Sequence, residues 1–144
     1  MNALDIAIYS LMVADTGVGG VNHATTGATG GFHQGVAPQG ATLPRIHFQE
    51  TLNIAEYSFQ TYVADHCYYQ FTAFAVDGNE EGATVAGRLA ERARVLFTDP
   101  SMMVSGKTLL YSRFERSIPP GYEWDAVKSR FIYSKGFLLQ LWLA

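Results

Sequence analysis

The sequence is short of charge, of cysteine and of long apolar runs. Only 16% of its 144 residues are Asp, Glu, Lys or Arg, whereas globular proteins average about 25%. Its 10 basic residues are outnumbered by 13 acidic ones, which gives a net charge of −3. This balance disfavours sequence-specific binding to duplex DNA, because such proteins are usually strongly basic. A contact with DNA that reads no sequence remains open.

Cysteine and targeting signals are equally scarce. Cys67 is the single cysteine, so no disulfide can form within the chain, which fits a reducing compartment or indifference to redox state. No run of about 18 apolar residues is present, and we therefore expect no transmembrane helix. The first residues lack a basic segment and Asp5 interrupts their apolar run, so we expect no signal peptide.

The chain contains enough apolar residues to form one hydrophobic core. Hydrophobic residues make up 48% of the sequence, and the length suits one domain. We therefore expect a single domain over residues 1–144. The spacing of apolar and turn residues predicts helices at 3–15 and 77–97, and strands at 45–49, 57–63, 66–76, 107–116 and 129–143.

This order predicts an α+β domain. We expect an antiparallel sheet of about four to five strands with two helices packed on one face. A long Gly/Thr-rich loop without any formal charge follows the first helix, and its extended part at 17–44 is expected to be flexible or ordered by a partner. Turns are expected at 64–65 and at 119–121, with a bend near Gly136.

Several motifs resemble ligand sites but fail on spacing. Residues 105–108 end like a phosphate-binding P-loop, yet Ser101 stands where the motif needs glycine. A dinucleotide motif from Gly17 would carry Asn22 at its sixth position, and a calcium loop from Asp77 would end on Arg88 instead of glutamate. We therefore expect no metal, no cofactor and no catalytic residue, and hence no enzyme.

The last strand is apolar on both faces. Seven of the eight residues from Phe137 to Ala144 are apolar, whereas a strand with one wet face alternates. One face can pack on the two helices. A neighbouring subunit is the simplest cover for the other, and a loop of the same chain is the alternative.

Two segments resemble a known family. They are Gly35-Val36-Ala37-Pro38-Gln39-Gly40-Ala41-Thr42-Leu43-Pro44 and the aromatic strand Tyr69-Gln70-Phe71-Thr72-Ala73-Phe74. With the order of elements around them, they are similar to the tail terminator, or tail completion, proteins of tailed bacteriophages. The stretch 17–34 is longer and richer in Gly and Thr than that family leads us to expect.

The resemblance implies a structural virion protein at the tail–head junction, assembled in the host cytoplasm. Such a protein forms a hexameric ring that caps the tail tube, ends its polymerisation and docks it to the neck. The implied partners are further copies of the chain, the tail tube protein and the neck or head completion (stopper) protein. Genomic DNA would pass through the lumen unread, and no membrane is involved. The family has no catalytic residues to carry over.

Two groups of residues are candidates for these contacts. Ring or partner contacts are expected from Phe32, His33, Val36, Pro38, Leu138 and Trp142. Charges that would meet the lumen or a partner are Arg113, Arg116, Lys128 and Arg130, for which a solvated edge is the competing interpretation.

Two alternatives to a tail terminator stay open. The first is another ring of the neck or head–tail connector, whose size and α+β composition would be similar. The second is an α+β domain or enzyme that binds a small molecule in an aromatic cleft. Its polar groups would be His47, His66 and Tyr69.

Overall fold

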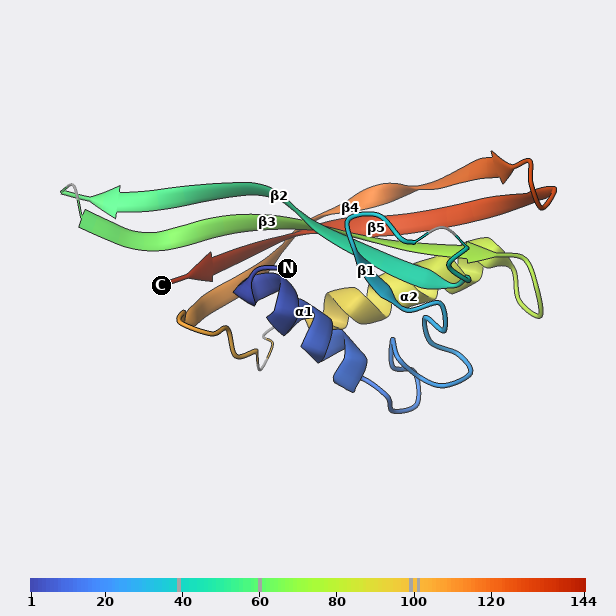
Figure 1. Ribbon diagram of the computed structural model, residues 1–144, viewed down its shortest axis with the longest axis horizontal. Helices are drawn as coiled ribbons and strands as arrows, with labels where there is room; N and C mark the ends of the chain where they lie inside the picture. The colour runs from blue at the N-terminus through green and yellow to red at the C-terminus, as the bar shows by residue number, and fades with distance from the viewer. Residues whose placement is uncertain (39, 60, 99, 101) are drawn as a thin grey trace.

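The computed structural model describes residues 1–38, 40–59, 61–98, 100 and 102–144. Two helices lie against one face of a five-stranded sheet whose strand order is β1-β2-β3-β5-β4 (Figure 1). This confirms the predicted α+β class and the two helices on one face. The elements are α1 (Ala3–Ala14), β1 (Phe32–Gln34), β2 (Arg45–Ser58), β3 (Thr61–Val76), α2 (Gly82–Leu96), β4 (Leu109–Asp125) and β5 (Arg130–Leu143).

The sheet is antiparallel except at one edge. β1 runs parallel to β2 and pairs Phe32 with Ile46 and Gln34 with Phe48. A purely antiparallel sheet was expected, because the Gly-rich stretch around β1 shows no alternation that would predict a strand. The three residues of β1 are held by β2 rather than by their own β propensity.

Two long hairpins make up most of the sheet, and both turns differ from the prediction. Tyr57 and Tyr62 face each other across the β2–β3 hairpin, so the predicted strand at 57–63 is wrong and the expected turn at 64–65 lies inside β3. Similarly, 119–121 lies within β4 at a register shift between Ile118 and Gly121. The actual β4–β5 turn spans 126–129. β5 is one unbroken strand through Gly136.

The two helices begin in different ways. Asn2 and Asp5 form the capping box that starts α1. α2 begins at Gly82, five residues later than predicted. Glu81 occupies the N-cap position without a side-chain cap, and the carboxylate of Asp77 accepts a hydrogen bond from the first helical N–H, that of Gly82, at 2.8 Å.

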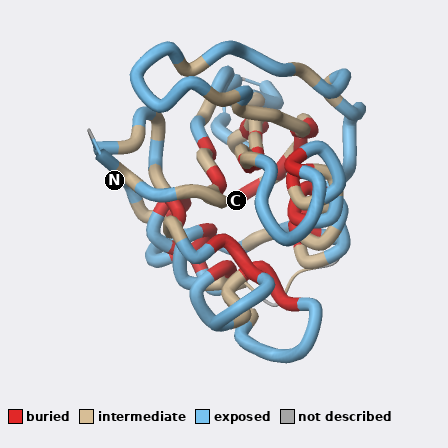
Figure 2. Tube along the Cα trace, turned by 90° about the vertical axis from the view of Figure 1, so that its right-hand side faces the viewer, coloured by how far each residue is buried: buried red, intermediate tan, exposed pale blue. Residues whose placement is uncertain are grey.

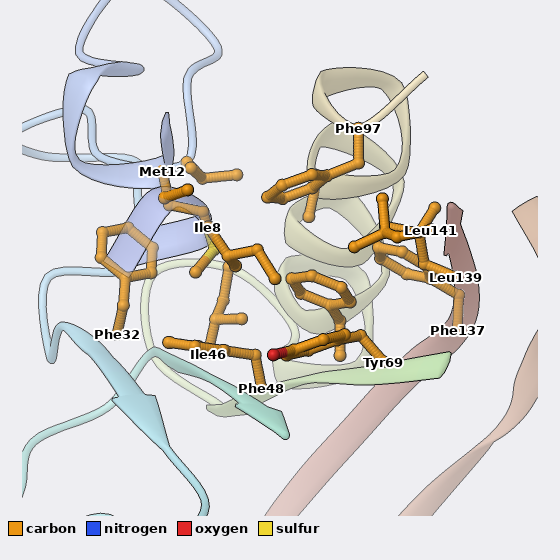
Figure 3. Packing of buried hydrophobic residues seen from close by; sticks show 14 of the residues in the cluster. Ile8, Met12, Phe32, Ile46, Phe48, Tyr69, Phe97, Phe137, Leu139 and Leu141 are labelled. Atoms are coloured by element: carbon orange, nitrogen blue, oxygen red, sulfur yellow. The ribbon is translucent and has the colours of Figure 1, made fainter. Parts of the chain in front are cut away.

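The core fills the space between the helices and the sheet (Figure 2). Ile8 and Met12 of α1 meet Phe97 at the end of α2 above the aromatic side chains of β3 (Figure 3). The rings of Phe71 and Phe137 stack with centroids 4.9 Å apart and join β3 to β5. Because alternate residues of a strand point to opposite faces, the neighbours of these core residues lie on the face that carries no helix.

Candidate interaction surfaces

The loop that follows α1 is folded onto the helices as a series of turns. Val21 and Ala28 are buried in the core, and the Ala28 N–H donates to the Val21 carbonyl at 2.6 Å. Asp15 anchors the start of the loop to α2 through a two-point ion pair with Arg92, whose shorter distance is 2.6 Å. This guanidinium also lowers the pKa of Asp15.

The predicted contact residues of this loop separate into two kinds. Phe32 is buried in the core of its own chain, edge-on to Tyr9 with ring centroids 6.4 Å apart. His33 is half-buried and its Nε2 lies 2.9 Å from the Gly30 carbonyl. Val36 and Pro38 are exposed, with 87% of Val36 accessible. Only these last two residues present apolar surface to a partner. Gln39 and Ser101 lie outside the described residues.

The second group of predicted contact residues lies on the sheet face that carries no helix, which we call the uncovered face. It includes Leu138, Gln140 and Trp142 of β5 beside His66 and Tyr68 of β3. The rings of His66 and Trp142 stack 3.9 Å apart, and Trp142 also stacks on Tyr111 of β4. The aromatic row crosses three strands. Leu138 and Trp142 stay half-exposed, so no loop of the described chain covers this face completely.

The four predicted cations do not form one cluster. Arg113 and Arg116 are exposed on the uncovered face, in register with Gln140 and Leu138. Arg130 begins β5 and pairs with Asp125 at 3.5 Å. Gln140, the partner of Arg113, lies ten residues along β5 from Arg130, a distance of about 33 Å at 3.3 Å per residue. Arg113 and Arg116 therefore form one basic site, while Lys128 and Arg130 mark the far hairpin.

Both hairpin ends carry exposed aromatic and aliphatic side chains that the sequence analysis did not single out. The hairpin tips extend past the helices at opposite ends of the sheet (Figure 1). The tip of the β2–β3 hairpin holds Tyr57 and the fully exposed Phe59. The β4–β5 hairpin shows Tyr122, Trp124 and Phe131, which pack on one another but not on a helix. At the β4–β5 hairpin the available signal was the density of aromatic residues at 122–133, a segment of which only 129–133 was predicted to be strand.

Helix α1 is apolar on its outer side as well. Ile6, Tyr9 and Val13 are exposed at helical spacing, opposite the buried Leu4, Ile8 and Met12. Ile6 also borders a shallow groove between the adjacent side of the helix and the segment at 102–105. A helix that is hydrophobic all round is normally covered on both sides, so α1 offers a third apolar surface.

The described residues do not assemble a reaction centre. Burial raises the pKa of the Cys67 thiol to about 12, so this thiol stays protonated and is a poor nucleophile. The three polar residues of the proposed small-molecule cleft are not brought together. His47 and His66 lie on the uncovered face, whereas Tyr69 points into the core and donates to Asp5 at 2.7 Å. Within the described ranges, no three His, Cys, Asp or Glu side chains gather where they could hold a metal.

His47 is nevertheless strongly perturbed. Its ring lies half-buried against Phe74, with centroids 4.8 Å apart. Its Nε2 accepts a hydrogen bond from the Arg45 Nε at 2.9 Å. Burial and the charge of Arg45 lower the pKa of His47 to about 4. The imidazole is neutral at physiological pH and acts as a structural acceptor.

Comparison with known proteins yields a structural match only. No protein-family model and no curated protein matches the chain. None of the helices in the described ranges combines the length and apolar character needed to cross a membrane. The fold is similar to a solved chain from the virion of a native gene transfer agent (GTA) particle. The TM-score is 0.65 at 10% sequence identity, over 97% of this chain and 93% of that chain, so the two chains share a fold over nearly their full lengths.

Proposed function

We propose that this chain is a structural subunit of a phage-like virion that assembles into a hexameric ring at the end of the tail tube. There it ends tube polymerisation and joins the tail to the neck of the head. Two lines of support meet in this proposal. The first is the fold shared with a chain of a gene transfer agent virion, and the second is the amount of apolar surface that a single copy leaves uncovered.

The uncovered surface is the observation that carries the proposal. The chain exposes 8218 Å², whereas a compact monomer of 15.8 kDa exposes about 7,300 Å². The excess of about 900 Å² is close to the roughly 800 Å² that each partner contributes to a standard interface. The hairpins project to opposite ends, so a contact at one end meets a different surface of the next copy. Head-to-tail contacts of this kind close into a ring when the rotation between neighbouring copies closes, and the proposal takes six copies for that closure.

The other predicted contact residues are assigned as follows. Val36 and Pro38 project from the loop that follows β1 and are proposed to meet the tail tube protein or the neck's stopper protein. Arg113 and Arg116 are proposed to face an acidic partner surface, and Lys128 and Arg130 are the candidates for facing DNA in the lumen. A lumen that passes DNA needs cations only for charge balance and reads no bases.

Native mass spectrometry of the purified chain, alone and with its tail tube protein, tests the ring. The expected species has six copies. A strictly monomeric chain under both conditions would refute the proposal. Imaging of the particle then separates the tail terminator from another connector ring. Density of this chain at the end of the tail tube supports the first, and density at the portal supports the second.

A further inference from the structure

We infer that neighbouring copies join through the two free edges of the sheet. The second half of β2 in one copy would pair antiparallel with the first half of β4 in the next. This inference rests on the proposed ring and identifies the surface through which its subunits would join. Four independent features of the two edges support it: unpaired backbone, exposed apolar side chains, matched geometry and opposite charge.

The β2 edge is open over its second half. β1 pairs only with Ile46–Phe48, and within the described residues no other strand lies on that side of residues 49–58. Alternate N–H and C=O groups there point away from β3. Native proteins protect such edges with Lys, Pro, bulges or inward-facing charge. Residues 49–58 contain no Lys, Arg or Pro, and their protection is limited to Glu50, in register with the core residue Tyr69, and two register shifts. Leu52, Ile54 and Tyr57 are exposed along it.

The β4 edge is open over its first half. β4 is the last strand of the sheet and pairs only with β5 in the described part of the chain. Residues 109–118 carry the exposed side chains of Leu110, Tyr111 and Phe114. Pro119 and Pro120 follow and lack the N–H that a ladder needs. The stretch able to add a strand therefore ends at Ile118.

The two stretches match in length and direction. Residues 49–58 and 109–118 are each ten residues long. β2 and β5 are both antiparallel to β3, and β4 is antiparallel to β5, so β2 and β4 run in opposite directions. A copy rotated about an axis roughly along the strands therefore brings the edges together antiparallel. Leu52 and Arg113 lie at the same level, through Tyr68 and Gln140, so Glu56 lies four residues, about 13 Å, further along the sheet than Arg113. A stagger of this kind arises when strands tilt from the axis around which sheets close, and it would set Glu56 opposite Arg113 of the next copy.

The edges also carry opposite charge. Residues 49–58 include Glu50 and Glu56 and no cation, whereas residues 109–118 hold Arg113 and Arg116 against Glu115. Glu56, Arg113 and Arg116 lie on the same, uncovered face by their register. None of these three side chains forms an ion pair within the described chain. Opposite charges across an interface favour this partner and fix its register.

A charge-swap experiment tests the contact. Glu56→Arg makes both edges of a chain basic on the uncovered face, and the double variant Arg113→Glu, Arg116→Glu makes both edges acidic. We expect each variant alone to assemble about tenfold or more weakly than the wild type. Mixed one to one, the variants can alternate around a six-membered ring, with every junction again opposite in charge. We therefore expect the mixture to recover the ring, measured by native mass spectrometry and sedimentation.

Matched controls separate charge from position. Glu81→Arg and Arg88→Glu make the same kinds of change at exposed sites off the two edges and should leave assembly unchanged. Thermal melting confirms that every variant folds. Folded variants that assemble like the wild type, or a mixture no better than its parts, would overturn the edge contact while leaving the ring standing. A wild-type chain that never forms a ring would overturn both.

Discussion

At the scale of single residues, the buried polar groups are held by few and specific contacts. Tyr69 and Asp5 join β3 to the start of α1 through one hydrogen bond in the core. His47 is kept neutral by its surroundings on the opposite face of the sheet. Neither contact was predictable from the sequence, because each depends on residues far apart in the chain or on the depth at which a strand is buried.

The Tyr69–Asp5 bond should be visible in stability. Tyr69→Phe keeps the ring but leaves one oxygen of the buried Asp5 carboxylate without its donor. Hydrogen bonds to charged groups contribute about 1.5–3 kcal/mol, and we expect the free energy of unfolding to fall by that amount in urea denaturation. Tyr122→Phe, at an exposed tyrosine, is the control and should change the free energy of unfolding little. Equal stability of the Tyr69 variant and the wild type would show that the bond contributes nothing.

His47 should make stability depend on pH. In the unfolded chain, His47 becomes protonated below its ordinary pKa of 6.5. In the folded chain, its imidazole stays neutral down to about pH 4. The free energy of unfolding therefore falls as the pH drops through this window. We expect the wild type to lose about 1–2 kcal/mol relative to His47→Gln between pH 7 and pH 4, less than the full shift because the ring is partly exposed. Parallel pH profiles of the two proteins in urea would contradict this.

At the scale of elements, the two hairpin turns show what local sequence can and cannot predict. The alternation of Tyr57, Phe59 and the residues around them continues through the first turn, which has no Gly, Pro or Asn to signal it. The strong turn signal Pro119-Pro120-Gly121 is instead absorbed by an irregular edge strand. α1, the last strand and the helix at 82–96 were predictable because their apolar spacing or caps are local.

The tip of the β2–β3 hairpin holds a residue with an unfavourable backbone conformation and an exposed apolar side chain. Phe59 has φ of +50° and is fully exposed, although the left-handed conformation costs a side chain about 1–2 kcal/mol. We expect Phe59→Gly to raise the free energy of unfolding by about 0.5–1 kcal/mol, since glycine removes the strain but frees the unfolded chain. The same variant should weaken assembly, because an exposed apolar anchor is lost.

Ser129 provides the matched control for this turn. It has φ of +49° at the other hairpin but no apolar side chain. Ser129→Gly should therefore stabilise the fold to a similar extent and leave assembly as it was. If both glycine variants assembled alike, the side chain of Phe59 would have no role in contacts between subunits.

At the scale of the whole molecule, the segments without charge contribute residues both to the core and to the exposed surface. The uncharged loop supplies Val21 and Ala28 to the core, while Val36 and Pro38 remain outside. The part of β5 from Gly136 onward, which carries no charge, is central in the sheet, with one face buried and the other half-exposed. Composition alone indicated that apolar surface was in excess, but its distribution over hairpin tips, sheet edges and α1 depends on tertiary packing.

A loop variant should separate ring formation from tail joining. Val36→Asp places a charge on the exposed apolar tip of the loop, 87% accessible in the single chain. We expect the ring to form normally and the yield of joined particles to fall about tenfold, as for loss of one well-buried interface side chain. Electron microscopy of free tails and complete particles measures this, with Thr42→Asp as the control. An unchanged yield would exclude Val36 from the docking surface.

The position of β5 has a consequence for how the subunit reaches its final form. β5 is the last strand along the chain, yet it lies between β3 and β4. Until it is synthesised, the β2–β3 hairpin stands alone with the inner side of β3 bare, a state prone to pairing with the wrong strand. The sheet is completed when β5 pairs with β3, a contact between segments far apart in the chain, and such long-range pairing is intrinsically slow. Subunit maturation, rather than subunit encounter, would then set the pace at which rings become available to a growing particle.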